Sequence, residues 1–169
     1  MVEPILFLTD TPDAEARQVI SEGLAGHGVE QAGYWDAQPL AVLARESSNG
    51  RILGGLLGRT SLGLLFIELA FLPKELRHHR LGSRMLYMME EDAARRGCRA
   101  AVLYTISFQA PGFYERHGWR EFGRIACDPP GTSRIFMTKE LLDTKTNTPH
   151  DASVRRDVPA GQHMAAGRP

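Results

Sequence analysis

The sequence predicts a mixed α/β domain whose front half is an antiparallel sheet. Three apolar runs, at residues 40–44, 51–59 and 62–72, follow one another with short polar turns between them. This arrangement is typical of consecutive antiparallel hairpins. From Gly82 to Gly97 the apolar spacing becomes helical, with charged residues on the opposite face. Strands and helices therefore alternate along one chain.

The segment before these hairpins has its own local signals. Residues 5–8 form a short apolar run, which predicts a buried strand. The Thr-Pro-Asp run that ends at Asp13 is a helix start signal, and the helix is expected to end near Gly26 or Gly28. We therefore expect a strand followed by a helix at the N-terminal end.

The elements after the long helix are shorter. Residues 101–105 predict a buried strand, residues 109–117 a short helix, and residues 119–123 and 133–138 two final strands. After Leu142 the composition changes.

The last segment, residues 143–169, contains no aromatic residue and three prolines. It buries too little apolar surface to offset the entropy that ordering would cost. We therefore expect one domain at residues 1–142 and a disordered tail at residues 143–169.

The charge balance and the cysteine content limit which binding partners and which compartment are expected. Basic and acidic residues balance at 20 each, so no general attraction to nucleic acid or to an anionic membrane is expected. Cys98 and Cys127 belong to no disulfide or metal-ligand pattern, which predicts small buried hydrophobic residues in a reducing cytoplasm. The adjacent His78 and His79 lack a third ligand, so we expect no metal.

The segment with the clearest chemical signal is the turn between the third apolar run and the long helix. It is basic, from Arg77 to Arg80, and Gly82 follows directly. The free N–H groups and the dipole of a helix start attract phosphate. On its own, the pattern also fits a basic turn that merely faces solvent.

This turn, Arg77-His78-His79-Arg80-Leu81-Gly82, resembles the pyrophosphate-binding turn of the GNAT acetyltransferase superfamily, R/Q-x-x-G-x-G/A, at three of its four informative points. Arg80 stands where the family usually has its first glycine. A side chain fits there if its φ is negative, and its charge can face the pyrophosphate.

The resemblance covers residues 4–142 and continues after the next strand. Ala110, Tyr114, Gly118 and Trp119 match the family there, whereas Ser107 replaces a frequent asparagine. The resemblance implies a single mixed, mostly antiparallel sheet of six to seven strands flanked by about four helices. It also implies that acetyl-CoA is the co-substrate. The residues it assigns to acetyl-CoA are Ala70, Phe71, Leu72, Arg77, His78, His79, Arg80, Leu81, Gly82, Ser83 and Ser107.

Two residues are candidates for proton transfer. Glu68 is a lone carboxylate in an apolar strand, where it must find a partner or take up a proton. The family often carries an acid on this strand, which implies a general base, and strand alternation places it on the side of Phe66 and Ala70. Alternatively, Glu68 faces solvent or pairs with an arginine. The resemblance implies that Tyr114 donates a proton to the departing thiolate; otherwise it is a core aromatic residue.

In the family, the segment that corresponds to residues 26–39 forms one wall of the binding site for the acceptor amine. There Tyr34 and Trp35 can flank an amine while Asp36 faces its charge, or they cap the core. The expected function is N-acetyl transfer to a primary amine of a small molecule. The alternatives are a protein amine as acceptor, or a CoA-binding regulatory or assembly module without catalysis. A homodimer is also compatible with the resemblance.

Overall fold

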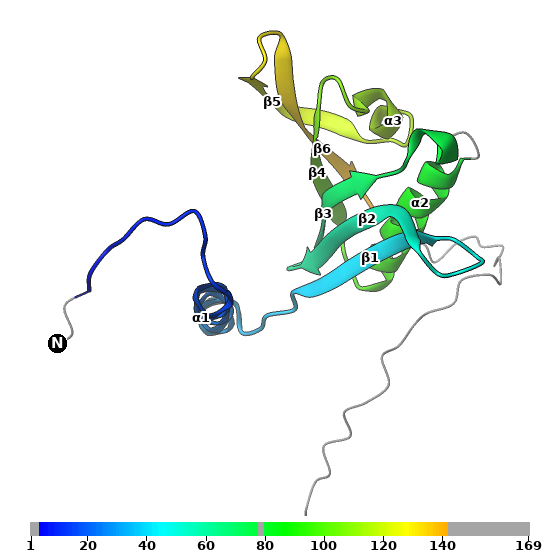
Figure 1. The fold of residues 1–169 in the computed structure, drawn as a ribbon. Coiled ribbons are helices and arrows are strands. Elements are labelled where there is room, and N and C mark those ends of the chain that lie inside the picture. Colours follow the sequence, from blue (N-terminus) through cyan, green and yellow to red (C-terminus); the bar gives the residue numbers. More distant parts are fainter. Residues whose placement is uncertain (1–3, 78–79, 142–169) are drawn as a thin grey trace, which may run out of the picture.

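The computed structural model describes residues 4–77 and 80–141, so the expected tail at 143–169 lies outside the described residues. The described chain forms one six-stranded sheet with three α-helices and a short 3₁₀ turn (Figure 1). In chain order these are α1 (Ala14–Ala32), β1 (Gln38–Arg45), β2 (Ile52–Ser61), β3 (Leu64–Phe71), η1 (Lys74–Leu76), α2 (Leu81–Arg95), β4 (Ala100–Ile106), α3 (Pro111–Glu115), β5 (Arg120–Cys127) and β6 (Thr132–Glu140). The predicted mixed, mostly antiparallel fold is confirmed.

The sheet is antiparallel except at its centre. The strand order is β1-β2-β3-β4-β6-β5, and the one parallel pair is β3 with β4. A parallel pair needs a crossover, and α2 supplies it. This helix packs across one side of the sheet, which we call the inner face; the opposite side is the outer face (Figure 1).

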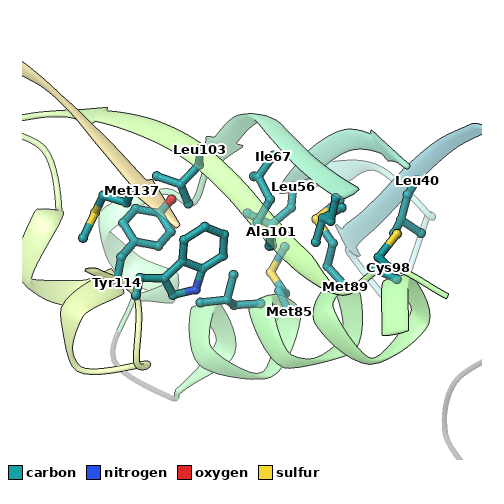
Figure 2. Close-up of a cluster of buried hydrophobic side chains, with 14 of the residues drawn as sticks. Leu40, Leu56, Ile67, Met85, Met89, Cys98, Ala101, Leu103, Tyr114 and Met137 are labelled. Atoms are coloured by element: carbon teal, nitrogen blue, oxygen red, sulfur yellow. The ribbon is translucent and has the colours of Figure 1, made fainter. Parts of the chain in front are cut away.

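The core lies between α2 and the inner face. The helical spacing in the sequence puts Met85, Leu86 and Met89 on the buried side of α2. Alternate residues of the strands, such as Leu65 and Met137, pack in the same cluster and are 0% exposed. Figure 2 shows this cluster, with Met137 among its labelled residues. Apolar burial on this face is the main stabilising contribution to the fold.

Polar contacts tie α2 to both halves of the sheet. The Glu90 carboxylate accepts a hydrogen bond of 2.8 Å from the Trp119 indole and one of 2.6 Å from the Lys139 ammonium on β6. At the C-terminal end of the helix, the C-cap residue Arg96 donates to the Pro39 carbonyl at 3.1 Å and to the Thr60 hydroxyl at 3.3 Å. The helix therefore bridges β1 and β2 to β6.

The N-terminal expectation is only partly correct. Asp13 caps α1 by accepting from the Ala16 N–H at 2.6 Å, as predicted. The strand expected at residues 5–8 is wrong: these side chains are 85–101% exposed and have no strand partner in the described chain. A strand is stable only when its backbone groups are paired, which a local apolar run does not guarantee.

The helix α1 also ends later than predicted. It runs through Gly26 and Gly28 and stops at Gly33, whose φ is 78°. Gly28 lies against the Trp35 ring, which leaves no room for a Cβ there, so packing and not helix termination explains this glycine. The helix has no buried residue and lies apart from the sheet (Figure 1).

Candidate active site

The sheet opens between its two parallel strands. β3 and β4 pair from Leu64 with Ala100 to Ile67 with Leu103, where the pairing ends. β3 nevertheless continues to Phe71 and β4 to Ile106. The two strands therefore diverge beyond the Ile67 and Leu103 pair, and their facing backbone edges form a wedge inside the sheet. We call this pair the apex of the wedge.

A β-bulge shapes the β3 side of the wedge. Ile67 pairs with Gly58 and Leu69 with Leu57 on β2, so Glu68 is the extra residue between two regular pairs. The expected alternation is wrong beyond this point. Ala70 lies opposite Leu56, a residue of the inner core, and directly opposed residues share a face of the sheet. Glu68 remains with Phe66 on the outer face, whereas Ala70 turns to the inner face.

The start of α2 lies at the mouth of the wedge. No side chain of the described residues caps its first turn, so the N–H groups of Leu81, Gly82 and Ser83 retain their capacity to bind an anion. A Cβ added at Gly82 would meet Leu72 at 3.5 Å and Phe113 at 3.6 Å, which places the helix start against the ends of β3 and α3. His78 and His79 lie outside the described residues.

The two arginines of the basic turn differ in role. The Arg77 side chain donates from Nε to the Leu72 carbonyl at 2.9 Å, which fixes the end of β3 instead of pointing at the helix start. Arg80 has a φ of 53°, in the left-handed region. The expectation of a negative φ for a side chain here is therefore wrong. The backbone keeps the shape for which glycine is best suited, and the arginine adopts it at a steric cost.

Glu68 pairs with an arginine, as one of the two interpretations of the sequence predicted. Its carboxylate forms an ion pair with Arg59 on β2, and the two side chains are 47% and 48% exposed. The Arg59 guanidinium also stacks on the Phe66 ring, at 4.7 Å from its centroid. Arg59 was missed by sequence reasoning, although a charged residue inside an apolar strand, facing a strand with a lone carboxylate, was an available signal.

The ion pair lines a pocket of about 400 Å³ on the outer face. The pocket also contains both apex residues, Ile67 and Leu103, so it adjoins the wedge. Aromatic side chains form much of its wall, and sequence reasoning did not single them out as a group because they come from four strands. These residues are Phe66, Tyr104, Phe122 and Phe136.

Tyr114 approaches the apex from the inner side. It is 7% exposed on α3 and packs edge-on against Trp119, with the ring centroids 5.9 Å apart. Its hydroxyl is directed toward Leu103 (Figure 2). Burial raises the pKa of this hydroxyl above its ordinary value, so it stays protonated at neutral pH. Tyr114 is thus a core aromatic residue whose protonated hydroxyl lies beside the apex.

The remaining candidate residues, a serine and two cysteines, do not lie at the apex of the wedge. Ser107 is bound to β6: its hydroxyl oxygen accepts from the Ser133 N–H at 3.1 Å, although its own proton can still be donated. Cys98 is buried, which raises the pKa of its thiol, so it does not resemble an activated nucleophile. Cys127 is partly buried. No metal-ligand cluster occurs among residues 4–77 and 80–141.

The expected acceptor residues are not brought to the wedge. Asp36 accepts a hydrogen bond of 2.7 Å from the Leu62 N–H in the turn between β2 and β3, at the opposite end of β3 from Phe71. Trp35 packs on α1, and Tyr34 is 53% exposed. In this structure these residues anchor the N-terminal segment and do not line the pocket.

Comparison with known proteins agrees with this architecture. The Acetyltransferase (GNAT) family matches residues 13–119. An acetyltransferase of Agrobacterium fabrum is 33% identical over 79% of this chain and 97% of its own. Blasticidin-S acetyltransferase of Streptomyces morookaense is 36% identical over 63% of this chain and 80% of its own.

A solved structure gives the same result. A candidate acetyltransferase from Agrobacterium tumefaciens superposes with a TM-score of 0.74 at 31% identity, over 81% of this chain and 99% of its own. In the described part of the present chain, no helix is long and apolar enough to cross a bilayer. The family match, the two relatives and the shared fold lead to one conclusion: this chain belongs to the GNAT family of acetyltransferases.

Proposed function

We propose that the chain transfers an acetyl group from acetyl-CoA to a primary amine of a small molecule. One observation carries the proposal: the wedge between β3 and β4 has its apex beside a pocket with a carboxylate on one side and the Tyr114 hydroxyl on the other. An extended ligand arm can pair with an open strand edge, so the wedge suits pantetheine. Acetyl-CoA, when bound, supplies the activated acetyl thioester.

The residues present fit such a ligand. The first turn of α2 offers backbone N–H groups to the pyrophosphate, since no side chain of the described residues caps it. The left-handed backbone at Arg80 preserves the turn that a glycine would adopt. Ala70, Phe71 and Leu72 provide the β3 edge of the wedge, and Ser107 lies just beyond the end of β4.

The chemistry requires a neutral amine. The amine nitrogen forms a bond to the thioester carbonyl carbon while the carbon–sulfur bond breaks, so one proton leaves nitrogen and one reaches sulfur. The Glu68 carboxylate, which pairs with Arg59, is the group placed to accept the amine proton. Tyr114, kept protonated by its burial, can donate to the thiolate. The two groups approach from opposite faces of the sheet, as a base and an acid on two sides of one reacting bond would.

The pocket supports a small molecule as the acceptor. Its volume of about 400 Å³ falls in the range of sites for small ligands, roughly 300–1,000 Å³. Its aromatic wall suits a cationic or planar group next to the amine. Among the relatives, the protein of Streptomyces morookaense is named as an acetyltransferase of blasticidin-S.

Two measurements test the proposal. Acetyl-CoA at 100 times its Kd should raise the unfolding free energy by about 2.7 kcal/mol, seen as a higher Tm, and desulfo-CoA serves as a non-reactive control. Thiol release from acetyl-CoA should then depend on an added amine. An unchanged Tm at millimolar acetyl-CoA would refute the proposed cofactor site.

A second candidate function is a CoA-binding regulatory or assembly module without catalysis. Two observations favour it: the strained Arg80 and the Ser107 hydroxyl held by the Ser133 N–H. This candidate predicts the Tm increase without amine-dependent thiol release across a broad panel of small amines. Thiol release with a protein amine but with no small amine would instead identify a protein substrate.

A further inference from the structure

The position of Tyr114 depends on contacts outside its own helix. The helix α3 has only five residues, and no side chain of the described residues caps its start. A helix this short is not stable by itself, so packing must fix where its side chains point. The Tyr114 ring meets Trp119 edge-on, and the Trp119 backbone N–H donates to the Tyr114 carbonyl at 3.1 Å. Whatever holds Trp119 in place therefore helps to hold the Tyr114 hydroxyl beside Leu103 (Figure 2).

Trp119 is held in turn by a buried hydrogen bond. It lies between α3 and β5 and belongs to neither, so strand pairing does not orient its side chain. Its indole N–H donates to the Glu90 carboxylate of α2 at 2.8 Å, and Trp119 and Glu90 are 2% and 8% exposed. A buried N–H group that loses its acceptor is costly, because it has given up water as a partner. The indole therefore stays where Glu90 accepts its hydrogen bond.

The second oxygen of the Glu90 carboxylate is also occupied. The Lys139 ammonium of β6 donates to it at 2.6 Å, so the carboxylate cannot rotate without losing one of its two donors. A buried ion pair adds little net stability, because taking the charges out of water costs about as much as their attraction returns. An attested use of such pairs is to select one arrangement of the surrounding groups. Here the group that is selected is the Trp119 indole.

We infer that Glu90 positions the proposed proton donor: through the Trp119 indole it holds the Tyr114 ring so that the hydroxyl stays beside the apex. The inference rests on the proposed function, in which Tyr114 protonates the departing thiolate. Proton transfer needs the donor within hydrogen-bond reach of the sulfur, and a displacement on the order of 1 Å is enough to lower the rate strongly. Glu90 does not line the pocket, so it is a positioning residue and acts only through its neighbours.

Three variants separate the indole bond from the ion pair. Glu90→Gln, Glu90→Met and Lys139→Met all lose the ion pair between α2 and β6, whereas only Glu90→Met takes the acceptor away from the indole. The rate at saturating amine and acetyl-CoA should fall by about 10-fold or more in Glu90→Met, and by less than about 3-fold in the other two. The affinity for acetyl-CoA should be the same in all three variants.

A second variant protects this test against misfolding. If circular dichroism shows that Glu90→Met is unfolded, Trp119→Phe removes the N–H from the other end of the same bond and should give the same loss of rate. Full turnover in the folded variant that lacks the bond would overturn the inference.

A double-mutant cycle with Tyr114→Phe distinguishes positioning from a purely structural role. If Glu90 acts through the Tyr114 hydroxyl, Glu90→Met should hardly lower the rate any further once that hydroxyl is absent. The same fold-loss in both backgrounds would overturn the inference, because Glu90 would then support the fold or another part of the site.

A titration that needs no activity measures the position of Tyr114 directly. Its tyrosinate absorbance, taken as the difference from Tyr114→Phe, should appear at a lower pH in Glu90→Met than in the wild type, because the released hydroxyl reaches water. The titratable groups around Tyr114 are Glu90 on α2, Lys139 on β6 and His117 after α3. Glu90→Gln removes the same carboxylate but keeps the indole bond, so it should titrate like the wild type, and Lys139→Met is the control for the ammonium.

This titration also separates failure of the inference from failure of the proposed function. If Tyr114→Phe retains full activity, the proposed role of the hydroxyl is wrong, yet a shifted titration in Glu90→Met would still show that Glu90 holds Tyr114 in place. An unchanged titration in Glu90→Met would overturn the positioning itself.

Discussion

The two halves of β3 differ in almost every respect. Leu64 to Ile67 pair with strands on both sides, and Leu65 and Ile67 are buried in the inner core. Leu69 to Phe71 pair only with β2 among the described strands, and these three residues and the bulged Glu68 are all exposed. The bulge at Glu68 separates the halves. One strand thus supplies both the foundation of the fold and one edge of the candidate active site.

The largest expected effect tests the stabilising half. Leu65→Ala removes a fully buried side chain and should lower the unfolding free energy by about 2–5 kcal/mol, measured by urea denaturation. Leu69→Ala, in the exposed half, should cost less than about 1 kcal/mol. Equal losses would show that the two halves do not divide their roles.

The next effect concerns the acid at the apex. Tyr114→Phe should lower the rate at saturating amine by about 100-fold or more, or about 2.7 kcal/mol, because the thiolate loses its proton donor. Acetyl-CoA affinity should hardly change. Tyr104→Phe is the control, since it removes a hydroxyl from the pocket wall on the outer face and should alter the rate only a few-fold. Full activity of Tyr114→Phe would assign the role to water or another residue.

Glu68, the residue at the bulge, should affect the rate of acetyl transfer and not the stability of the fold. Glu68→Gln should reduce the rate at neutral pH by roughly 10- to 100-fold, because an amide cannot accept the amine proton. Glu46→Gln breaks a comparable surface pair, Glu46 with Arg51 at 3.3 Å, in the turn between β1 and β2. That control should retain full turnover. If both variants behave alike in steady-state kinetics, Glu68 is a surface residue only.

Alkaline unfolding sharpens the assignment of Tyr114. Burial raises the pKa of its hydroxyl above the ordinary value of 10.0, so the folded chain holds this proton more tightly than the unfolded chain. The resulting stability is present below about pH 10 and is lost as the pH rises toward the folded pKa, by at most about 1.4 kcal/mol per pH unit. Urea unfolding between pH 8 and 11 should show a shallower decline in Tyr114→Phe. Parallel curves would mean that this hydroxyl is not desolvated.

The smallest expected effect concerns Arg80, in the turn that follows the exposed half of β3. Arg80→Gly should stabilise the chain by about 0.5–1 kcal/mol, because glycine adopts a positive φ without steric strain. Leu62→Gly, at a φ of 49° in the turn before the buried half, should give a similar gain. Titration with acetyl-CoA separates the two: a contact between the guanidinium and phosphate predicts weaker binding in Arg80→Gly alone. Equal affinities would limit Arg80 to a backbone role.

Periodicity and turn signals predicted most of the fold. The strands β1 to β4, the strand β6 and the helix α2 follow from apolar spacing, because the same side chains that set the pattern fill the inner core. The strand β5 was also expected, although it contributes no buried residue. The strand at residues 5–8 could not be judged in this way, since its existence depends on a partner far along the sequence. The late end of α1 depends on Trp35 packing at Gly28, which is also a tertiary contact.

The candidate site was less accessible to sequence reasoning. Residue types in the turn at Arg77 to Gly82 indicated an anion site, but the φ of Arg80 and the bond from Arg77 to the Leu72 carbonyl are set by three-dimensional geometry. The bulge at Glu68 arises from register, which no single strand encodes. The pairing with Arg59 follows from that register. The roles of Glu68 and Tyr114 in catalysis stay predictions.

The polar contacts of Glu90 and of the C-cap residue Arg96 have a mechanical consequence. Glu90 joins the helix to Lys139 on one arm of the sheet, and Arg96 joins it to Pro39 and Thr60 on the other. The helix therefore acts as a brace that sets the angle between the arms before any ligand arrives. A ligand that enters the wedge between β3 and β4 should therefore need little free energy to open it. Removing the contacts of Glu90 or of Arg96 should widen the wedge, although neither residue lines it.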